Sequence, residues 1–485
     1  MIELTPLLHR ESKTPLYAQL YYYIKKEIET GNVPSGELLP SIRRLSLHLQ
    51  ISKNTVEGAY QQLLAEGYIE SIPRVGLKVL KLEEPFASNT DKRISSYDKV
   101  TEREKRKPDP KLSGTKIYDF VYGDVDVEHF PKQWWKKYMQ EAFEDETGDV
   151  FMYGDPLGDF GLREELSSYL LQSRGVHCHP EQIVITPGTQ HAISLLCQLL
   201  SLYGLPVAIE EPGYDGVRSV FINQGCSIEP IPLEKDGIDL SILHSSKANL
   251  VYVTPSHQLP QGMILPIQKR LELLQWAEKN RGYILEDDYD SEFRYQGQPI
   301  SALKALDKKE NVIYLGTFSK CFLPAARVSY LVLPPKLAET YKKKFHNYNQ
   351  ASSPIIQKAL YLFMKSGDFE RHIRRMKKVY QAKHQTLMKS LKESFNDEIE
   401  VIGERSGLHV LMKVKGKSEQ QLIAKAMHHQ VKVYSLSKFC YSSVTDCAMI
   451  MLGFGKLSEE EIAEGVRRLH KAWMNESISE KGSRE

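Results

Sequence analysis

The chain has 485 residues, more than one hydrophobic core usually supports, so at least two domains are expected. It has 41% hydrophobic and 26% charged residues and a formal net charge of +2, so any nucleic-acid contact must come from a local patch. The six cysteines form no Cys-x-x-Cys pair, and neither a signal peptide nor a run of roughly 20 apolar residues is present. We therefore expect a cytoplasmic protein with no membrane partner and no metal site.

The first eighty residues carry the pattern of a small α+β domain. Three helical segments and then two strand-like segments are expected over residues 15–30, 42–49, 53–66, 68–72 and 77–80. Ser41 and Ser52 stand where a hydroxyl can cap the second and third helices, and Gly31 and Gly67 follow the first and third. This order predicts a winged helix-turn-helix domain over residues 1–80.

Polar side chains outside the predicted core of this domain suit DNA. An asparagine can bind adenine, a lysine can reach guanine or phosphate, and a wing-tip glycine permits a close approach to the backbone. The candidates are Arg43, Arg44, Ser52, Lys53, Asn54, Thr55, Arg74 and Gly76. The alternative is a three-helix protein-binding module whose charges are solvated.

The run Leu39-Pro-Ser-Ile-Arg-Arg-Leu-Ser, followed by Ile51-Ser-Lys-Asn-Thr-Val-Glu-Gly-Ala-Tyr, resembles the DNA-binding domain of GntR-family repressors. The resemblance implies a double-stranded DNA operator as partner. It also implies DNA contacts at the positions Arg43, Lys53, Asn54, Thr55 and Gly76.

Residues 81–115 are charged, contain prolines and have few large apolar side chains, which predicts a flexible linker. From residue 116 to residue 485, strand-like and helix-like segments alternate, as in an α/β domain with a largely parallel sheet. Strands are expected at 183–186, 206–210, 250–254, 283–287, 312–315 and 328–333, and helices at 133–143, 161–173, 190–202 and 267–280. Ligands of such sheets bind at the carboxyl ends of the strands, where the polar clusters of this sequence fall.

One lysine follows the strand expected at 312–315. A lysine partly withdrawn from water has a depressed pKa and can condense with an aldehyde, which suits Lys320. Thr317 and Arg327 nearby can hold a phosphate. Aldehyde and phosphate together describe pyridoxal 5′-phosphate, although a surface lysine at a strand end is the alternative.

Three further clusters follow predicted strands. Gly188 and Thr189 open a helix after a strand, which favours an anion site. Tyr214 is placed to stack on a planar cofactor, and Gln258 to reach the phenolic oxygen of a pyridoxal ring. Each also has a plain structural alternative as a cap, a packed turn residue or a loop residue.

An acidic cluster follows the strand expected at 283–287. Asp287 is placed to keep a pyridine nitrogen protonated, and Tyr289 to bind the O3′ oxygen of the ring. A metal site is the rival for the carboxylates Glu286, Asp287, Asp288 and Asp290, and it ranks lower because no histidine is evident at matching strand ends.

Taken in order, these motifs resemble the fold-type I enzymes of the class I/II aminotransferases, which implies a large α/β domain and a small C-terminal α+β domain. The resemblance implies that Lys320 forms the internal aldimine, and that Asp287 and Tyr289 bind the ring. It assigns the phosphate to Arg327, Thr317, Gly188 and Thr189. Tyr153 lies in a loop that, in such enzymes, reaches the partner subunit's phosphate.

A GntR-type domain joined to an aminotransferase-like domain resembles the MocR/GabR-type transcriptional regulators. The resemblance implies a domain-swapped homodimer that senses an amine, an amino acid or pyridoxal phosphate itself through aldimine exchange at Lys320. The alternatives are a working aminotransferase with a DNA-binding domain attached, and a repressor whose large domain only dimerises. Lys438 and Gly216 stand where an arginine is expected for a carboxylate-bearing effector, which weakens an assignment to γ-aminobutyrate.

Overall fold

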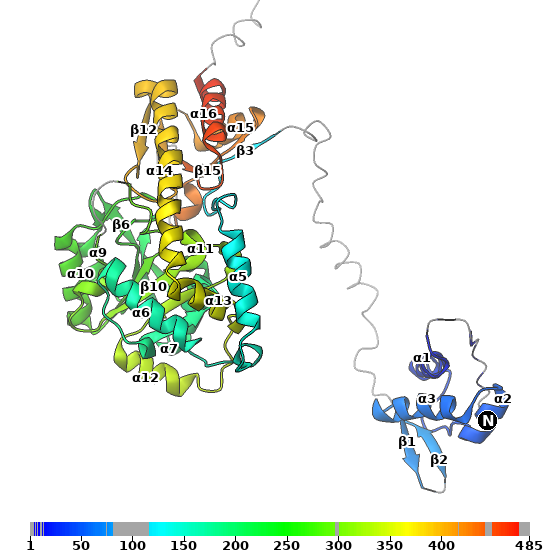
Figure 1. Ribbon diagram of the computed structural model, residues 1–485. Coiled ribbons are helices and arrows are strands. Elements are labelled where there is room, and N and C mark those ends of the chain that lie inside the picture. The colour runs from blue at the N-terminus through cyan, green and yellow to red at the C-terminus, as the bar shows by residue number, and fades with distance from the viewer. Residues whose placement is uncertain are drawn as a thin grey trace, which may run out of the picture. The chain divides into compact units, whose positions relative to one another are not determined.

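The computed structural model describes residues 14–73, 75–80, 116–295, 300–415, 417–441 and 449–474, together with residues 4, 6, 8, 9 and 12. The chain divides into two compact units, Met1–Ser113 and Gly114–Glu485 (Figure 1). The segment predicted as a linker, 81–115, and the wing residue Arg74 lie outside the described residues.

The N-terminal unit is a winged helix-turn-helix, as the sequence predicts. Its elements are α1 (Leu16–Glu29), α2 (Ile42–His48), α3 (Lys53–Ala65) and the antiparallel hairpin of β1 (Ile69–Ile72) and β2 (Gly76–Val79). The Ser41 hydroxyl accepts a hydrogen bond from the Arg44 amide at 3.3 Å, and the Ser52 hydroxyl accepts one from the Thr55 amide at 3.1 Å. Both serines therefore cap their helices, and the apolar faces of the helices enclose a core of their own.

A mixed sheet forms the centre of the large unit. Among the described residues it has eight strands in the order β4 (Ile183–Thr186), β11 (Ser329–Val332), β10 (Val312–Thr317), β9 (Tyr283–Asp288), β8 (Leu250–Val253), β5 (Pro206–Glu211), β6 (Ser227–Glu234) and β7 (Gly237–Ile238). The neighbours from β10 to β6 pair in parallel, whereas β11 is antiparallel to both of its neighbours and β7 is antiparallel to β6. The prediction of a largely parallel α/β sheet is confirmed, and β11 adds the antiparallel strand.

Helices cover both faces of this sheet because its strands are apolar on both sides. Along β10, Ile313 and Leu315 pack toward one face, whereas Val312 and Tyr314 pack toward the other. The first face is covered by α7 (Thr189–Leu199), α8 (Asp215–Asn223) and α12 (Pro335–Lys344). The second face is covered by α5 (Lys132–Phe143), α6 (Phe160–Arg174), α9 (Leu240–Ser245), α10 (Ile267–Asn280), α13 (Pro354–Lys365) and the start of α14 (Asp368–Phe395).

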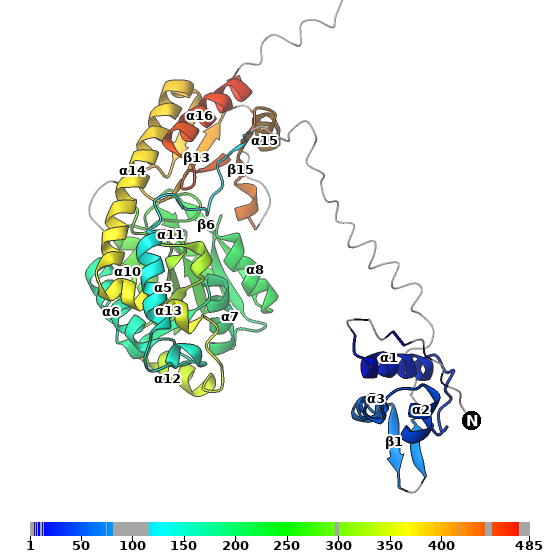
Figure 2. The same cartoon turned by 45° about the vertical axis from the view of Figure 1, so that its right-hand side comes forward.

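A smaller α+β subdomain follows along the chain, as expected. Figures 1 and 2 show α14 running from beside α5 and α13 up to this subdomain. The subdomain contains the antiparallel sheet β12 (Ile399–Ile402), β13 (His409–Val414), β16 (Met449–Gly453) and β15 (Tyr434–Ser435), covered by α14, α15 (Glu419–His428) and α16 (Glu459–Met474). A separate parallel pair joins β3 (Tyr118–Asp119) to β14 (Val431–Lys432).

Short helical turns complete the large unit: the α-helical turn α11 (Phe318–Cys321) and the 3₁₀ turns Asp149–Phe151, Pro180–Gln182, Lys304–Leu306, Pro324–Ala326, Asn396–Glu398 and Ser437–Phe439. None of the described helices has the length and apolar character that a membrane span requires.

Candidate functional site

A cavity of about 230 Å³ lies where β9 and β10 end. Seven of its lining residues were predicted as cofactor ligands: Thr189, Tyr214, Asp287, Tyr289, Thr317, Lys320 and Arg327. Six were not: Tyr122, Gly123, Gln190, Leu259, Ser319 and Pro324. The fold thus brings together residues that lie up to about two hundred positions apart in the chain.

Lys320 lies on α11, immediately after β10. Its Nζ donates a hydrogen bond to the Gly123 carbonyl at 3.0 Å and stands 4.5 Å from the centre of the Tyr122 ring. Burial lowers the pKa of Lys320 to about 8, although the carboxylates Asp290, Asp124 and Asp287 oppose this shift. A lysine in this state offers a neutral amine at a pH where an exposed lysine stays charged.

Asp287 is separated from its acidic neighbours by the alternation of side chains along β9. The Tyr252 hydroxyl donates to Asp287 Oδ2 at 2.6 Å, whereas Oδ1 is buried and has no hydrogen-bond partner. On the opposite face, Glu286 accepts two backbone N–H groups, and Asp288 pairs with Arg174 at 2.6 Å. Only Asp287 of these three therefore has a carboxylate oxygen left for a ligand in the cavity.

The carboxylates considered as a metal site are used differently. Burial raises the pKa of Glu286 and of Asp287 to about 7, so both are costly to ionise without a partner. Asp290, which follows β9, lies 2.9 Å from His257, which follows β8. The sequence analysis had not placed a histidine beside these carboxylates. Within the described part of the chain, no group of three or more possible ligands is arranged to hold a metal ion.

An anion-binding corner lies where α7 begins. Gly188 has a φ of +111°, and a Cβ added there would lie 2.4 Å from Arg327 Nη2. Arg327, itself left-handed with a φ of +51°, donates from Nη2 to the Pro187 carbonyl at 3.0 Å. Thr189 opens the helix next to this guanidinium, so the helix N-terminus and the cation point to one place. Glycine is required at residue 188 because any side chain would fill the corner.

Thr317 contributes a hydroxyl at the end of β10. It accepts hydrogen bonds from the Ser319 amide at 3.2 Å and from the Ser329 hydroxyl at 2.8 Å. Thr317 therefore caps α11 and lines the cavity with Lys320, which it helps to position.

The structure does not bring Gln258 into the cavity. Its Nε2 donates to the Pro212 carbonyl at 2.9 Å and to the Leu259 carbonyl at 2.8 Å, and its Oε1 accepts from the Gln261 amide. The neighbouring Leu259 lines the cavity instead. The amide of Gln258 thus stabilises the loop in which it lies. From the polar sequence of that loop alone, this role cannot be told apart from ligand binding.

The two positions that lack an expected arginine, Gly216 and Lys438, have different surroundings. The ring of Tyr214 lies close to Gly216. A Cβ added at Gly216 would be 2.6 Å from the tyrosine Cζ. Lys438 places its Nζ 4.9 Å from the Phe439 ring, and its carbonyl accepts from Arg218 at 2.9 Å. Tyr214 therefore occupies the space that a side chain at residue 216 would need.

The N-terminal unit exposes Arg43, Arg44, Lys53, Asn54 and Gly76, with Lys53 and Asn54 in the first turn of α3. The two hydroxyls predicted beside them are already paired, with Ser52 Oγ 2.8 Å from Thr55 Oγ1. Ser52 caps α3 through the Thr55 amide, whereas the other five residues are exposed to the solvent.

Several lining residues escaped the sequence reasoning because their roles depend on distant parts of the chain. Tyr122 and Gly123 follow the two-residue strand β3, which is too short to show a periodic pattern. Tyr252 lies within an apolar strand, where its hydroxyl gives no local signal. An alternation test could have found it, since Tyr252 points to the same face of the sheet as Asp287.

Comparisons with known proteins define the class of each unit. Residues 116–469 match the family "Aminotransferase class I and II", and residues 16–79 match "Bacterial regulatory proteins, gntR family". The large unit resembles the crystal structure of LysN, an alpha-aminoadipate aminotransferase from Thermus thermophilus, with a TM-score of 0.66 and 28% identity over 73% of this chain and 92% of that chain. Class I and II aminotransferases are enzymes that depend on pyridoxal phosphate, and GntR-type helix-turn-helix regulators bind DNA.

Relatives that share both units narrow the assignment. The uncharacterized HTH-type transcriptional regulator YdeL of Bacillus subtilis is 39% identical over 97% of this chain and 100% of its own length. The probable rhizopine catabolism regulatory protein MocR of Rhizobium meliloti is 31% identical over 96% of both chains. The chain belongs to the family of GntR-type transcriptional regulators of the MocR type, which carry an aminotransferase-like domain.

Proposed function

We propose that the protein is a transcriptional regulator that binds pyridoxal 5′-phosphate at Lys320 and senses a small amine or amino acid there. The observation that carries this proposal is that Lys320 and Asp287 line the same cavity. Lys320 is a buried amine with a lowered pKa, and Asp287 is a buried carboxylate with one oxygen unpartnered. The rest of the lining fits a flat, phosphorylated ring between them.

Three features of the cavity support the fit of this cofactor. The bare Oδ1 of Asp287 suits a protonated pyridine nitrogen, because it is a buried acceptor without a donor. The corner at Gly188 would be closed by a Cβ, and Arg327 and Thr189 border it as a phosphate site requires. Tyr214 lines the cavity and offers an aromatic face.

When bound, pyridoxal phosphate supplies an aldehyde carbon that bonds reversibly to primary amines, so an amine effector competes with Lys320 for it. Arg327 and Thr189 would hold its phosphate, and Asp287 would keep a proton on its ring nitrogen, since all three line the cavity. Because burial lowers the pKa of Lys320 to about 8, about half of this amine is neutral at that pH and able to bond to the aldehyde carbon.

The surroundings of Lys320 suggest how effector binding reaches the rest of the chain. Lys320 donates a hydrogen bond to the Gly123 carbonyl. The residues just before Gly123 are joined to the small subdomain by backbone hydrogen bonds. The Gly453 amide of β16 donates to the Phe120 carbonyl at 2.9 Å, and the Phe120 amide donates to the Lys432 carbonyl at 3.0 Å. A change at Lys320 therefore acts on the segment through which the large unit continues toward the N-terminal unit.

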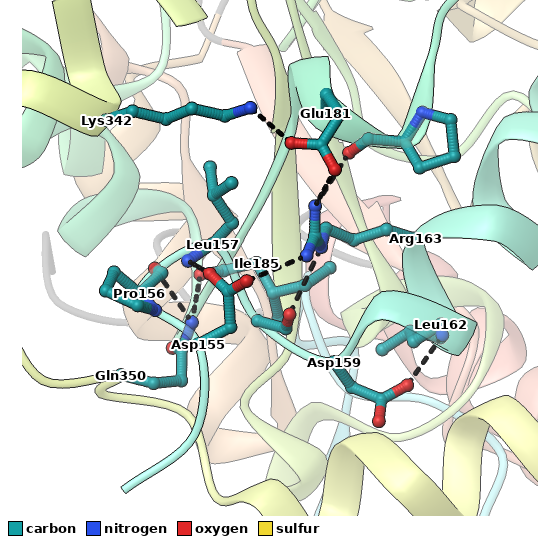
Figure 3. A network of polar contacts seen from close by, with 12 residues as sticks. Asp155, Pro156, Leu157, Asp159, Leu162, Arg163, Glu181, Ile185, Lys342 and Gln350 are labelled. Atoms are coloured by element: carbon teal, nitrogen blue, oxygen red, sulfur yellow. Dashed lines mark hydrogen bonds and ion pairs between the residues drawn. The ribbon is translucent and has the colours of Figure 1, made fainter. Parts of the chain in front are cut away.

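A homodimer belongs to the same proposal. The arm that contains Phe151, Met152 and Tyr153 exposes 59%, 68% and 75% of these side chains, an apolar row that calls for a partner surface. Figure 3 shows how the base of this arm is fixed by Arg163, which lies 3.2 Å from the Asp155 carboxylate and donates to the Gly158 carbonyl at 3.1 Å. An exposed apolar segment with a fixed base fits the contact with a second subunit, including the domain-swapped arrangement inferred from the family.

The test is the visible absorption spectrum of the purified protein, compared with the Lys320→Ala variant, during titration with pyridoxal phosphate and then with amines. We expect a band that the variant lacks, and an effector amine that changes both the band and operator binding in a gel-shift assay. A wild-type protein that binds no pyridoxal phosphate would refute the cofactor assignment.

A working aminotransferase is the second candidate, because Lys320, Asp287 and Arg327 form a complete set in the cavity. Sustained turnover of an amino donor with a keto acid would favour this candidate over a regulator that only senses. We expect the bound cofactor to be converted at most once by an amino donor, without turnover.

A further inference from the structure

His257 was not among the predicted site residues, yet it joins a buried polar cluster behind the cavity. Its Nδ1 lies 3.0 and 2.9 Å from the two carboxylate oxygens of Asp290. The Tyr289 hydroxyl lies 3.0 Å from the same Nδ1 and donates to the His257 carbonyl at 2.9 Å. All three side chains are at least 92% shielded from solvent, since they expose 3%, 2% and 8%.

The hydrogen atoms of this cluster can be assigned by elimination. An ionised carboxylate only accepts hydrogen bonds, so His257 Nδ1 carries the hydrogen that faces Asp290. Nδ1 then cannot accept from Tyr289, so the phenol directs its own hydrogen to the His257 carbonyl. The phenol has a single hydrogen, so an acceptor in the cavity competes with the His257 carbonyl for it, whereas the hydrogen on Nδ1 stays directed at Asp290.

The histidine ring has no freedom to leave this position. A Cβ at Gly407 would lie 2.0 Å from His257 Cε1, and a Cβ at Gly262 would lie 3.2 Å from Nε2. Both glycines have positive φ values, +79° and +72°, and Nε2 is buried without a hydrogen-bond partner. The two glycines thus leave the room that the ring fills, and Asp290 fixes the ring through Nδ1.

We propose that His257, held by Asp290, is a positioning residue that fixes the Tyr289 hydroxyl and lets it donate a hydrogen bond into the cavity. The proposal rests on the proposed function, because the acceptor in the cavity is the oxygen of the bound pyridoxal ring. The other titratable groups near this cluster include Tyr122, Asp287 and Lys320 at the cavity, Tyr252 and Tyr295, and His409, whose ring lies beside that of His257.

The charge of Asp290 has a second consequence at this site. Asp290 is the largest of the influences that raise the pKa of Lys320 against the effect of burial. The His257–Asp290 pair therefore influences two groups of the cavity: Tyr289 through a hydrogen bond, and Lys320 through the charge of Asp290. Neither contact brings the pair itself to the reacting atoms.

Replacing His257 by asparagine or by glutamine tests whether the hydrogen bond of Nδ1, rather than the volume of the side chain, positions Tyr289. In His257→Asn the side-chain amide occupies the place of Nδ1 and can donate to Asp290, whereas in His257→Gln it occupies the place of Nε2 and cannot. The matched control is His409→Gln. The ring of His409 lies 5.3 Å from that of His257, and its Nε2 bonds to the Pro260 carbonyl at 2.9 Å, which a glutamine amide can replace.

The measurement is the pH midpoint of the visible band of the pyridoxal-phosphate-loaded protein. A hydrogen bond donated by Tyr289 favours the ionised form of its acceptor, so its loss raises the midpoint, by roughly one pH unit for one hydrogen bond. We expect this rise in His257→Gln and in Tyr289→Phe, no further rise in the double variant, and midpoints like the wild type in His257→Asn and His409→Gln.

An unchanged midpoint in His257→Gln would overturn the proposal, and so would an equal rise in His409→Gln or in His257→Asn. A wild-type protein without any band is a different outcome, because it overturns the proposed cofactor function itself. Circular dichroism of each variant shows whether it folds. If His257→Gln does not fold, His257→Ala replaces it, with the same expected rise.

Discussion

The hydrogen bond from Tyr252 to Asp287 offers a quantitative test of the cavity. In Tyr252→Phe the carboxylate loses its partner at 2.6 Å, and neither of its oxygens then has a donor. A hydrogen bond to a charged group stabilises it by about 1.5–3 kcal/mol, which corresponds to about 1–2 pKa units. The pKa of Asp287, already raised to about 7 by burial, is therefore expected to rise further.

The consequence for binding follows from the ionised fraction. At about pH 7.5 that fraction falls from about three-quarters to about one-tenth if the pKa rises by roughly 1.5 units. Because the carboxylate must ionise to pair with a protonated ring nitrogen, we expect roughly tenfold weaker binding. The assay is a titration of the cofactor-free protein with pyridoxamine 5′-phosphate, which has no aldehyde and so reports the cavity without a bond to Lys320.

The control is a double-mutant cycle with Asp287→Asn. If Tyr252 acts through Asp287, its removal costs little more affinity once the carboxylate is gone, and the two effects are far from additive. Fully additive losses, or unchanged affinity in Tyr252→Phe, would refute the reasoning. Thermal melts of the four proteins show that the fold is retained.

Three further predictions concern other parts of the chain. Gly188→Ala is expected to weaken pyridoxamine phosphate binding at least tenfold, because the Cβ would lie 2.4 Å from the neighbouring guanidinium, with inorganic phosphate as a second probe. The rate at which Lys320 bonds to pyridoxal phosphate should rise up to about pH 8 and then level, since the lowered pKa makes the amine neutral there. Lys53→Ala and Asn54→Ala should each weaken operator binding about 5- to 150-fold in gel shifts, while Lys26→Ala on α1 should not.

Each of these predictions has a contradicting result. An unchanged phosphate affinity in Gly188→Ala would mean that the corner is not the phosphate site. A bonding rate that keeps rising beyond about pH 9 would mean that Lys320 titrates like an exposed lysine. Operator affinity that falls equally in Lys26→Ala would point to a nonspecific effect of charge rather than to the first turn of α3.

Much of the architecture could be predicted because local chemistry fixes it. The serine caps of α2 and α3, the glycine that precedes α7 and the apolar runs of β9 and β10 act over a few residues. These features place Lys320 and Asp287 at neighbouring strand ends in any parallel sheet that pairs the two strands. The candidate pair could therefore be named without coordinates.

The remaining residues of the site depend on packing between distant segments. Gln258 and Leu259 are adjacent, and only the path of the loop decides which of them faces the cavity. His257 meets Asp290 across 33 positions of the chain, and Gly407 leaves room for its ring from a different strand connection. No pattern within either segment predicts such a meeting, because each contact is made by the tertiary fold.

The position of Lys320 links the cavity to the first described segment of the large unit. Its amine is the donor that holds the Gly123 carbonyl, and Gly123 lies eight positions after Thr115, the last residue before the described part of the large unit. A lysine bonded to an aldehyde carbon can no longer donate as an ammonium group does, so this contact depends on the bonding state of Lys320. If the protein senses amines by exchange at Lys320, replacing Lys320 by alanine should leave operator binding insensitive to every amine. An amine response that persists in Lys320→Ala would place the sensor elsewhere.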